Sequence, residues 1–346
     1  MKANNLNKNI IQSILKKAIQ CMQENPEREI RNLVDIGVMF AKGHFQKQFF
    51  LAAEKELAKE NSRYYKLVTQ SVRKTDKEVL LSFGINLGYN SLTYGANTIR
   101  GFERQSGFHV PWVLYIQLSD NGCLDTGALD SLILQGEKIG IYSYILIIQT
   151  EFSKAEELGN LIKSHKDCAF MLLAGPDWEA AHIDVLQKLN NLFVGVDISS
   201  HGREEIMGAV NRLRKAKILC GAFCPRTEKA PFDMEKAALE TASYECELIF
   251  VLDEHSFFTE NQEQIKKTLY DMRFRLTAPA IPFDLMADTV VIDRNISSEG
   301  CLALVSENGR FHVTDMETGK RNDDYSIMDT DLETILSRTL PKQPGP

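Results

Sequence analysis

The sequence predicts an α/β protein built on a parallel sheet, and two observations lead to this fold class. Beyond residue 111, short apolar runs alternate with amphipathic helical stretches about every 25 residues, which is typical of β-α units. Each run is mostly apolar on both of its faces, as expected for a strand that is covered on both sides. With 346 residues, the chain can bury a large core without disulfide or metal staples.

Residues 1–80 are expected to form a helical region. Apolar side chains recur at spacings of three and four between residues 10 and 22 and again between 30 and 41. Gly43 and the Asn61-Ser62 pair interrupt this pattern. We therefore expect three or four helices of about 15 residues, packed on one another or on the rest of the chain.

Residues 81–110 are expected to form an irregular connector with short helical turns. The segment contains the stretch FGINLGYNSLTYGAN, which is rich in Gly and Asn. These residues favour turns and loops over regular structure.

Residues 111–278 are expected to form the sheet with six β-α units. The apolar runs assigned to strands are 112–118, 142–148, 169–174, 192–198, 217–223 and 247–252. The helical stretches are 128–139, 153–165, 178–190, 203–215, 233–244 and 259–276. This alternation does not decide between an open doubly wound sheet and a partial barrel. In both folds, ligands bind beyond the carboxyl ends of the strands.

Residues 279–346 are expected to be a small extension without further β-α units. The run TVVIDRN, at 289–295, predicts a short strand. A hairpin should follow and turn at Asn308-Gly309, because Asn-Gly is the strongest short hairpin signal. A last helix should begin near Asp329 and reach Leu340, with a frayed tail after it.

The charge pattern disfavours nucleic acid as a partner. The formal net charge is −7, so the chain as a whole repels phosphate backbones. Residues 1–80 carry 15 Lys and Arg against 9 Asp and Glu, whereas the remainder carries 25 against 38. We interpret the basic segment as a solvated face or as a surface docked on the acidic remainder.

The seven cysteines predict reduced thiols in a cytoplasmic protein. Their number is odd, none of them forms a CxxC pair, and most lie inside apolar runs. No charged and apolar leader precedes them. No apolar stretch approaches the roughly 20 residues that cross a bilayer, so no membrane partner is expected.

Polar and titratable side chains gather where the predicted strands end. They are Asp120, Cys123, Gln149, Thr150, Glu151, Ser199, His201, Cys224, Asp253 and His255. Because the carboxyl ends of parallel strands meet at one rim, we expect these side chains to line the mouth of the sheet or barrel. Such a set has the chemistry to bind a metal or to transfer protons. Strand-end loops are also polar because they are solvated, and no HxxxH, HxH or CxxC spacing marks a preformed metal site, so no metal is expected.

Five segments occur in the order in which one enzyme family carries them. They are HVPW before the first strand, LDSLILQGEKIGIYSYILII, SHKDCAFMLLA, LFVGVDISSHG, and a late GC followed by the Asn-Gly hairpin. Together, from about residue 31 to 314, they resemble radical S-adenosylmethionine (SAM) enzymes with an auxiliary-cluster (SPASM-like) extension. The resemblance implies a partial (β/α)6 barrel of the TIM type, a helical N-terminal region and a small C-terminal hairpin extension.

The motifs that carry the chemistry of that family are missing. The loop after the first strand holds a [4Fe-4S] cluster through three cysteines spaced CxxxCxxC in the family, whereas here it offers only Cys123. The GGEP-like turn that cradles the methionyl amine reads Gln149-Thr150-Glu151 and retains only the acid. Ala174-Gly175 replaces a Thr-Asn pair. Ser199 and His201 match the serine and the acidic neighbour of the family only in part.

The resemblance therefore implies a degenerate radical-SAM-like protein, a pseudoenzyme that acts as a binding scaffold. Its partner would be a peptide, a small ligand in the barrel mouth or an active radical SAM enzyme. No cofactor is expected, least of all a [4Fe-4S] cluster. Two alternatives remain open at the same mouth. One is an enzyme that uses Glu151, His201, Cys123 and His255 in acid-base or metal-assisted chemistry, and the other is cluster-free binding of SAM.

Overall fold

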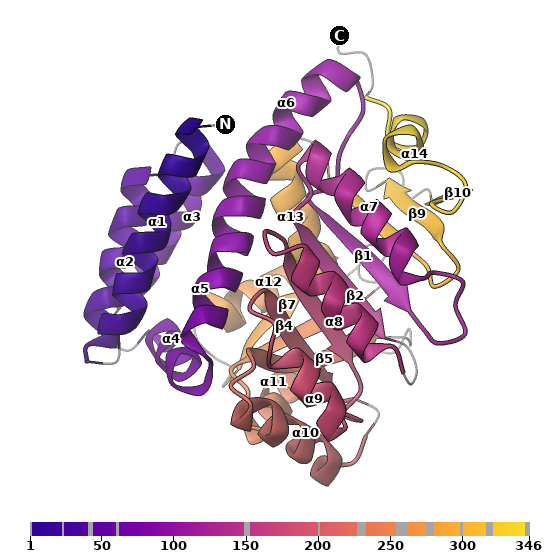
Figure 1. The fold of residues 1–346 in the computed structure, drawn as a ribbon. Helices are drawn as coiled ribbons and strands as arrows, with labels where there is room; N and C mark the ends of the chain where they lie inside the picture. The colour runs from indigo at the N-terminus through magenta and orange to yellow at the C-terminus, as the bar shows by residue number, and fades with distance from the viewer. Residues whose placement is uncertain are drawn as a thin grey trace.

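A ten-stranded sheet organises the chain (Figure 1). The computed structural model describes residues 2–22, 24–40, 44–59, 62–148, 153–199, 201–226, 233–253, 262–274, 280–297, 300–315 and 321–342. Seven strands lie in parallel and in chain order: β1 (Val113–Leu118), β2 (Ser143–Ile148), β3 (Ala169–Ala174), β4 (Leu192–Asp197), β5 (Cys220–Arg226), β6 (Leu248–Asp253) and β7 (Ile281–Asp284). In a doubly wound sheet the spatial order of the strands reverses at a switch point. Here it follows the chain order from β1 to β7, as in a barrel. Within the described residues β7 does not pair with β1, and the predicted partial barrel is confirmed.

Helices cover the outer face of the sheet. They are α7 (Thr126–Ile139), α8 (Ala155–Ser164), α9 (Ala180–Leu186), α10 (Arg203–Lys215), α11 (Met234–Ser243) and α12 (Gln262–Phe274). Tyr144 of β2 marks this face, because its hydroxyl donates to the carbonyl of Ile133 in α7. Figure 1 shows α7 to α10 in front of the strands.

Helix α13 (Leu285–Ser297) packs on the opposite, concave face of the sheet. Leu114 pairs with Tyr144 in the register of β1 and β2, so the neighbouring Tyr115 points to the concave side. The Tyr115 hydroxyl lies 2.8 Å from the carbonyl oxygen of Leu285 and 2.7 Å from the Thr289 hydroxyl. Helix α13 also contacts β6, β7 and β8, and so it fills part of the barrel interior.

The expectation that the alternation stops after residue 279 was wrong, and so was the strand at 289–295. A seventh unit, β7 and α13, replaces both. Asp284 starts the helix by accepting hydrogen bonds from the backbone N–H groups of Met286 and Ala287. The β-branched run is helical because one side of it, with Thr289, Val290 and Asp293, is buried there. Tertiary packing thus overrides the local strand preference.

The edge strand β7 is closed to further pairing. Ile281 donates its N–H to the carbonyl of Glu247 next to β6. At the next residue, Pro282 has no N–H to offer on the open side, and its carbonyl accepts a hydrogen bond from Arg273 Nε at 2.6 Å. Arg273 also pairs with Asp288 of α13. These contacts explain why the sheet ends here.

The C-terminal segment extends the sheet beyond β1. Strand β8 (Cys301–Val305) runs parallel to β1, and β9 (Arg310–Asp315) and β10 (Arg321–Ser326) follow in antiparallel order. The hairpin predicted at Asn308-Gly309 is confirmed, and Gly309 has a φ of 76°. Strand β10 was not foreseen. Helix α14 (Leu332–Thr339) begins at the N-cap Asp331, two residues later than expected.

Four N-terminal helices form a separate layer, as predicted. They are α1 (Lys2–Cys21), α2 (Pro26–Phe40), α3 (His44–Leu57) and α4 (Arg63–Lys74). Their shared core contains Ala18, Met22, Ile30, Leu57 and Tyr65. Figure 1 shows α1 to α3 beside the long helix that enters the barrel unit.

The irregular connector expected at 81–110 was wrong. Helix α5 (Lys77–Ile85), a π-helix η1 (Asn86–Gly95) and helix α6 (Ala96–Ser106) run without a break. The asparagines are not turn residues here. Asn86 Nδ2 donates to the carbonyls of Lys166 and Cys168, and Asn90 Nδ2 donates to that of Asp167, each at 2.8 Å.

The helical region covers the amino ends of the strands. Lys8 pairs with Asp167 at 2.8 Å just before β3, and Lys74 pairs with Glu247 at 2.7 Å just before β6. Asp76 N–H donates to the carbonyl of Lys217 before β5. The carboxyl ends of the strands therefore lie at the opposite end of the barrel from the helical region. Within the described residues, no helix has the length and apolarity to cross a bilayer.

Candidate functional site

The concave face at the carboxyl ends of the strands is the candidate site. The strand register turns Gln117 of β1 to this face, two residues beyond Tyr115, and also Asp197 of β4. Between them the inward residues Ile147 and Leu173 are apolar and buried. A few polar groups on an apolar concave wall are typical of a ligand site.

Asp120 and Cys123 lie in the loop after β1. Both carboxylate oxygens of Asp120 accept from the backbone N–H of Ser153, at 3.0 and 2.9 Å. Asp120 therefore joins this loop to the one that follows β2. The Cys123 side chain is exposed. Within the described residues, no hydrogen bond or ion pair joins either of them to another predicted site residue.

Ser199 continues the inward side of β4 beyond Asp197. Its backbone N–H and its hydroxyl both donate to Asp197 Oδ1, at 2.8 and 2.7 Å. Asp197 is 9% exposed, and Ser199 is exposed. This turn presents a carboxylate at the rim in a fixed orientation.

His201 lies beside the loop that follows β3. Its Nε2 is 3.6 Å from Asp177 Oδ2, and the imidazole side chain is 27% exposed. Asp177 does not cap α9, whose N-cap is Glu179. A histidine next to a carboxylate at a strand end has the chemistry of a general base.

Cys224 is turned away from the mouth. The register of β4 and β5 puts it on the same side as Cys220 and Ala222, which is the helix-covered face. Burial raises the pKa of the Cys224 thiol to about 12, and the carboxylates of Asp197 and Glu240 add to this shift. A thiol held neutral in this way is a packing group.

The remaining predicted site residues lie outside what the structure describes. Gln149, Thr150, Glu151 and His255 belong to segments beyond the described ranges. Asp253 is the last residue of β6, and its backbone alone is described.

Two inward residues of the first strand were missed by sequence reasoning. Gln117 is half-buried and has no hydrogen-bond partner within the described chain. Ser119, at the next inward position, is 7% exposed, and its hydroxyl also has no partner there. The signal was visible, because Gln and Ser alternate with apolar residues in the run YIQLS.

The cysteines do not fit a three-thiolate cluster at the mouth. All seven lie in described residues, and none of them forms a disulfide. Cys168, Cys220, Cys246 and Cys301 lie at or just before the amino ends of strands, and Cys21 lies in α1. Only Cys123 remains in the loop after β1, and the described residues hold no group of three or more metal-ligating side chains. A cluster that needs three sulfur ligands has one here.

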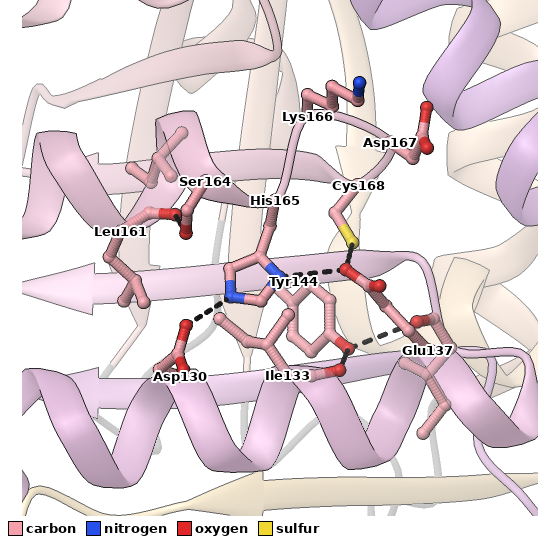
Figure 2. Close-up of polar contacts among 12 residues, drawn as sticks. Asp130, Ile133, Glu137, Tyr144, Leu161, Ser164, His165, Lys166, Asp167 and Cys168 are labelled. Atoms are coloured by element: carbon pink, nitrogen blue, oxygen red, sulfur yellow. Dashed lines mark hydrogen bonds and ion pairs between the residues drawn. The ribbon is translucent and has the colours of Figure 1, made fainter.

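A second polar cluster lies buried at the amino end of β3, away from the mouth (Figure 2). His165 lies between two carboxylates of α7, with Nδ1 2.9 Å from Glu137 Oε1 and Nε2 3.0 Å from Asp130 Oδ1. The Cys168 thiol donates to the same Glu137 oxygen at 3.2 Å. The cluster fastens α7 to the segment that enters β3.

The contacts in this cluster fix its charges. Burial lowers the pKa of His165, but the hydrogen bonds with Glu137 and Asp130 outweigh it and raise the pKa overall. Burial raises the pKa of Glu137, but the hydrogen bonds from His165 and Cys168 outweigh it and lower the pKa overall. Burial raises the pKa of Cys168 far above its ordinary value. A histidine held between two carboxylates beside an inert thiol is a structural arrangement.

Comparisons with known proteins give only distant likenesses. No protein-family model matches the chain, and no curated protein matches it. Among solved structures, Streptococcus suis SuiB bound to S-adenosylmethionine is 10% identical, with a TM-score of 0.49 over 93% of this chain and 80% of that one.

Two further structures are similar at the same level. SuiB bound to the precursor peptide SuiA is 10% identical, with a TM-score of 0.48 over 88% of this chain and 81% of that one. The protein anSMEcpe with bound AdoMet and the Cp18Cys peptide is 12% identical, with a TM-score of 0.41 over 66% of this chain and 80% of that one. Likenesses this distant carry no argument about activity or ligand, and the fold class rests on the strand order given above.

Proposed function

We propose that the chain is a binding protein that holds a peptide segment on the concave face of its open barrel and performs no radical SAM chemistry. The observation that carries the proposal is the composition of the mouth. Gln117 and Asp197 stand on an otherwise apolar wall, and a single cysteine stands where a cluster would need three.

The open barrel favours a long ligand over a compact one. A closed eight-stranded barrel is filled by its own side chains or holds one small molecule. Here the sheet stops at β7, and α13 occupies the interior around Tyr115. A ligand that lies across the mouth can therefore leave it at the side. A peptide bound in this way can be presented to a partner enzyme, and we propose an active radical SAM enzyme as that partner.

The setting that we propose is the reducing cytoplasm. The seven cysteines all lie in described residues, and no disulfide joins any of them. Four of them are buried, which protects them in the folded chain.

The first experiment measures iron and sulfide after anaerobic purification and reconstitution. We expect less than one iron per chain and no broad brown absorbance, because Cys123 alone cannot anchor a cluster. The matched variant Cys123→Ser should give the same values. Several irons and sulfides per chain, lost in Cys123→Ser, would overturn the proposal that the chain performs no radical SAM chemistry.

The second experiment selects peptides from a phage-displayed library of random 12-residue sequences. We expect peptides that bind the intact chain and that bind Asp197→Asn more weakly, because this carboxylate stands on the inward side of β4. Unchanged binding to an exposed control, Glu204→Gln in α10, locates the site at the mouth. Failure to select any specific peptide would overturn the peptide function.

A second candidate function is acid-base catalysis, favoured by the His201 and Asp177 pair at 3.6 Å. A histidine oriented by a carboxylate is a common general base. The two functions differ in what His201→Gln changes. A binding protein keeps its peptide affinity to within about twofold, whereas an enzyme loses turnover of the bound peptide, which mass spectrometry detects. Titration calorimetry with SAM alone tests cluster-free binding of that cofactor, for which we expect no heat.

A further inference from the structure

Gln117 and Ser119 form a row on the concave face that the fold does not use. Tyr115 and Gln117 take alternate positions on the inward side of β1, and Ser119 follows two residues after Gln117, just past the end of the strand. Tyr115 is tied to α13 through Leu285 and Thr289, so it belongs to the core. Gln117 and Ser119 lie beyond that contact, toward the carboxyl end of β1.

Both side chains have unused hydrogen-bonding groups. The Gln117 amide has no partner within the described residues, although it is half-buried. The Ser119 hydroxyl is buried without a partner in a residue that is only 7% exposed. A buried polar group without a partner costs about 1–3 kcal/mol, so native proteins rarely leave one without a reason. A ligand that supplies the partner is such a reason.

The spacing of this row matches a polypeptide backbone. Residues two apart along a strand are separated by about 6.6 Å, which is also the repeat of an extended peptide. A glutamine amide both donates and accepts, and so it can pair with the N–H and the C=O of one residue of an extended peptide, which point to the same side. A serine hydroxyl one repeat further along can bind the next unit that faces it.

The inward positions of β1 to β4 offer no counter-charge to an anionic ligand. The inward positions of β1 to β4 are Val113, Tyr115, Gln117, Ser143, Ile145, Ile147, Ala169, Met171, Leu173, Phe193, Gly195 and Asp197. None of them is Lys or Arg, and the one charged residue is the carboxylate of Asp197. Phosphate or carboxylate ligands would find no counter-charge on this wall, whereas a neutral amide needs none.

We propose that Gln117 and Ser119 bind the backbone of an extended peptide that runs along β1, with Gln117 holding the N–H and the C=O of one peptide residue by two hydrogen bonds. The inference rests on the proposed function, because it names the groups that hold the peptide there. Recognition through backbone groups sets the register of the peptide, and apolar neighbours such as Met171 contact its side chains.

The experiment uses a peptide selected on the intact chain and a set of variants. Gln117→Leu removes the amide but keeps the size of the side chain, and Gln105→Leu makes the same change on an exposed position of α6. We expect Gln117→Leu to weaken the Kd about three- to tenfold, and Gln105→Leu to leave it unchanged. Ser119→Ala should weaken the Kd by a smaller factor, and the exposed Ser13→Ala should not. Equal thermal midpoints show that each variant is folded.

Backbone esters in the peptide test the contact itself. Each amide is replaced in turn by an ester, which removes one N–H donor. We expect one ester position to weaken binding to the intact chain and to have no added effect in Gln117→Leu, since the lost partner is the same. A peptide that binds at the mouth, is weakened by Asp197→Asn, and is indifferent to Gln117→Leu overturns this inference and leaves the proposed function standing. A library without any binder contradicts both.

Discussion

Two carboxylates favour the charged form of His165, and this makes the stability of the chain depend on pH. The pKa of His165 is raised and that of Glu137 is lowered in the folded protein. A raised histidine pKa stabilises the fold fully below the unfolded value of 6.5, and the contribution is lost as pH rises through the folded value. A lowered glutamate pKa stabilises the fold above the unfolded value of 4.5, and this contribution is lost as pH falls. The cluster is therefore most stabilising between these two values.

We predict that His165→Gln lowers the free energy of unfolding by about 1–3 kcal/mol near pH 5.5, because Glu137 and Asp130 lose a buried charged partner. The difference from the unmodified chain should shrink at pH 8 and at pH 3.5. Urea unfolding at the three pH values measures it. His312→Gln, which removes a more exposed pair with Asp323, is the matched control and should change stability by less than about 1 kcal/mol. A difference that is the same at all three pH values would contradict the charged cluster.

Residue-level chemistry could be predicted only where it sits at strand ends. Asp120, Ser199 and His201 were placed at strand ends in this way, and the structure describes a contact for each of them there, whereas their role in a site stays a prediction. Gln117 was missed because the alternation in YIQLS is short and matches no motif. Cys224 was predicted at the mouth because the alternation of side chains along a strand separates its two faces but does not show which face is the inner one.

At the scale of the elements, the long helix from α5 to α6 shows how composition misleads. Gly95 lies where the π-helix meets the loop before β2. A Cβ built on it would lie 2.5 Å from the carbonyl oxygen of Gly140, so the glycine serves close packing. The Gly-rich and Asn-rich segment is therefore helical because of contacts that only the folded chain supplies. The strand run at 289–295 became helical for the same kind of reason.

We predict opposite effects for two glycines in this helix. Gly95→Ala should lower the free energy of unfolding by about 1–3 kcal/mol, because backbone atoms must move to admit the methyl group. Gly101→Ala, in α6 with no heavy atom within 4 Å of the added carbon, should raise it by up to about 1 kcal/mol. Denaturant midpoints of the two variants measure this. Stabilisation by both changes would contradict the close approach at Gly95.

The elements that the sequence did predict share a strong periodic signal. The six strand runs beyond residue 111 match β1 to β6 to within a few residues, and the helices between them follow. Strand β7 is only four residues long and carries a proline, which hides it from a search for apolar runs.

On the scale of the whole molecule, the helical layer and the mouth lie at opposite ends of the strands. Lys8 and Lys74 pair with acids that precede β3 and β6, whereas Asp197 and Ser199 lie where β4 ends. The basic N-terminal segment thus docks partly on the acidic remainder. Its helices close the amino end of the barrel and leave the candidate site uncovered by these contacts.

We predict that Lys74→Met destabilises the chain without changing the affinity for a selected peptide. The Lys74 and Glu247 side chains are 26% and 21% exposed, and loss of their 2.7 Å pair should cost about 0.5–1.5 kcal/mol. Lys59→Met removes a pair within the helical layer, with Glu56, and is the control. Thermal unfolding and peptide titration measure the two effects separately. A tenfold loss of affinity in folded Lys74→Met would show that the two ends communicate.

Pro282 has a consequence for how copies of this protein behave at high concentration. Exposed sheet edges recruit strands from neighbouring molecules and so seed aggregates. At β7 the missing N–H and the carbonyl occupied by Arg273 give an incoming strand nothing to bond at that residue. The margin of the barrel that stays open for a guest is thereby protected against self-assembly, and crowding should not turn it into a fibril template.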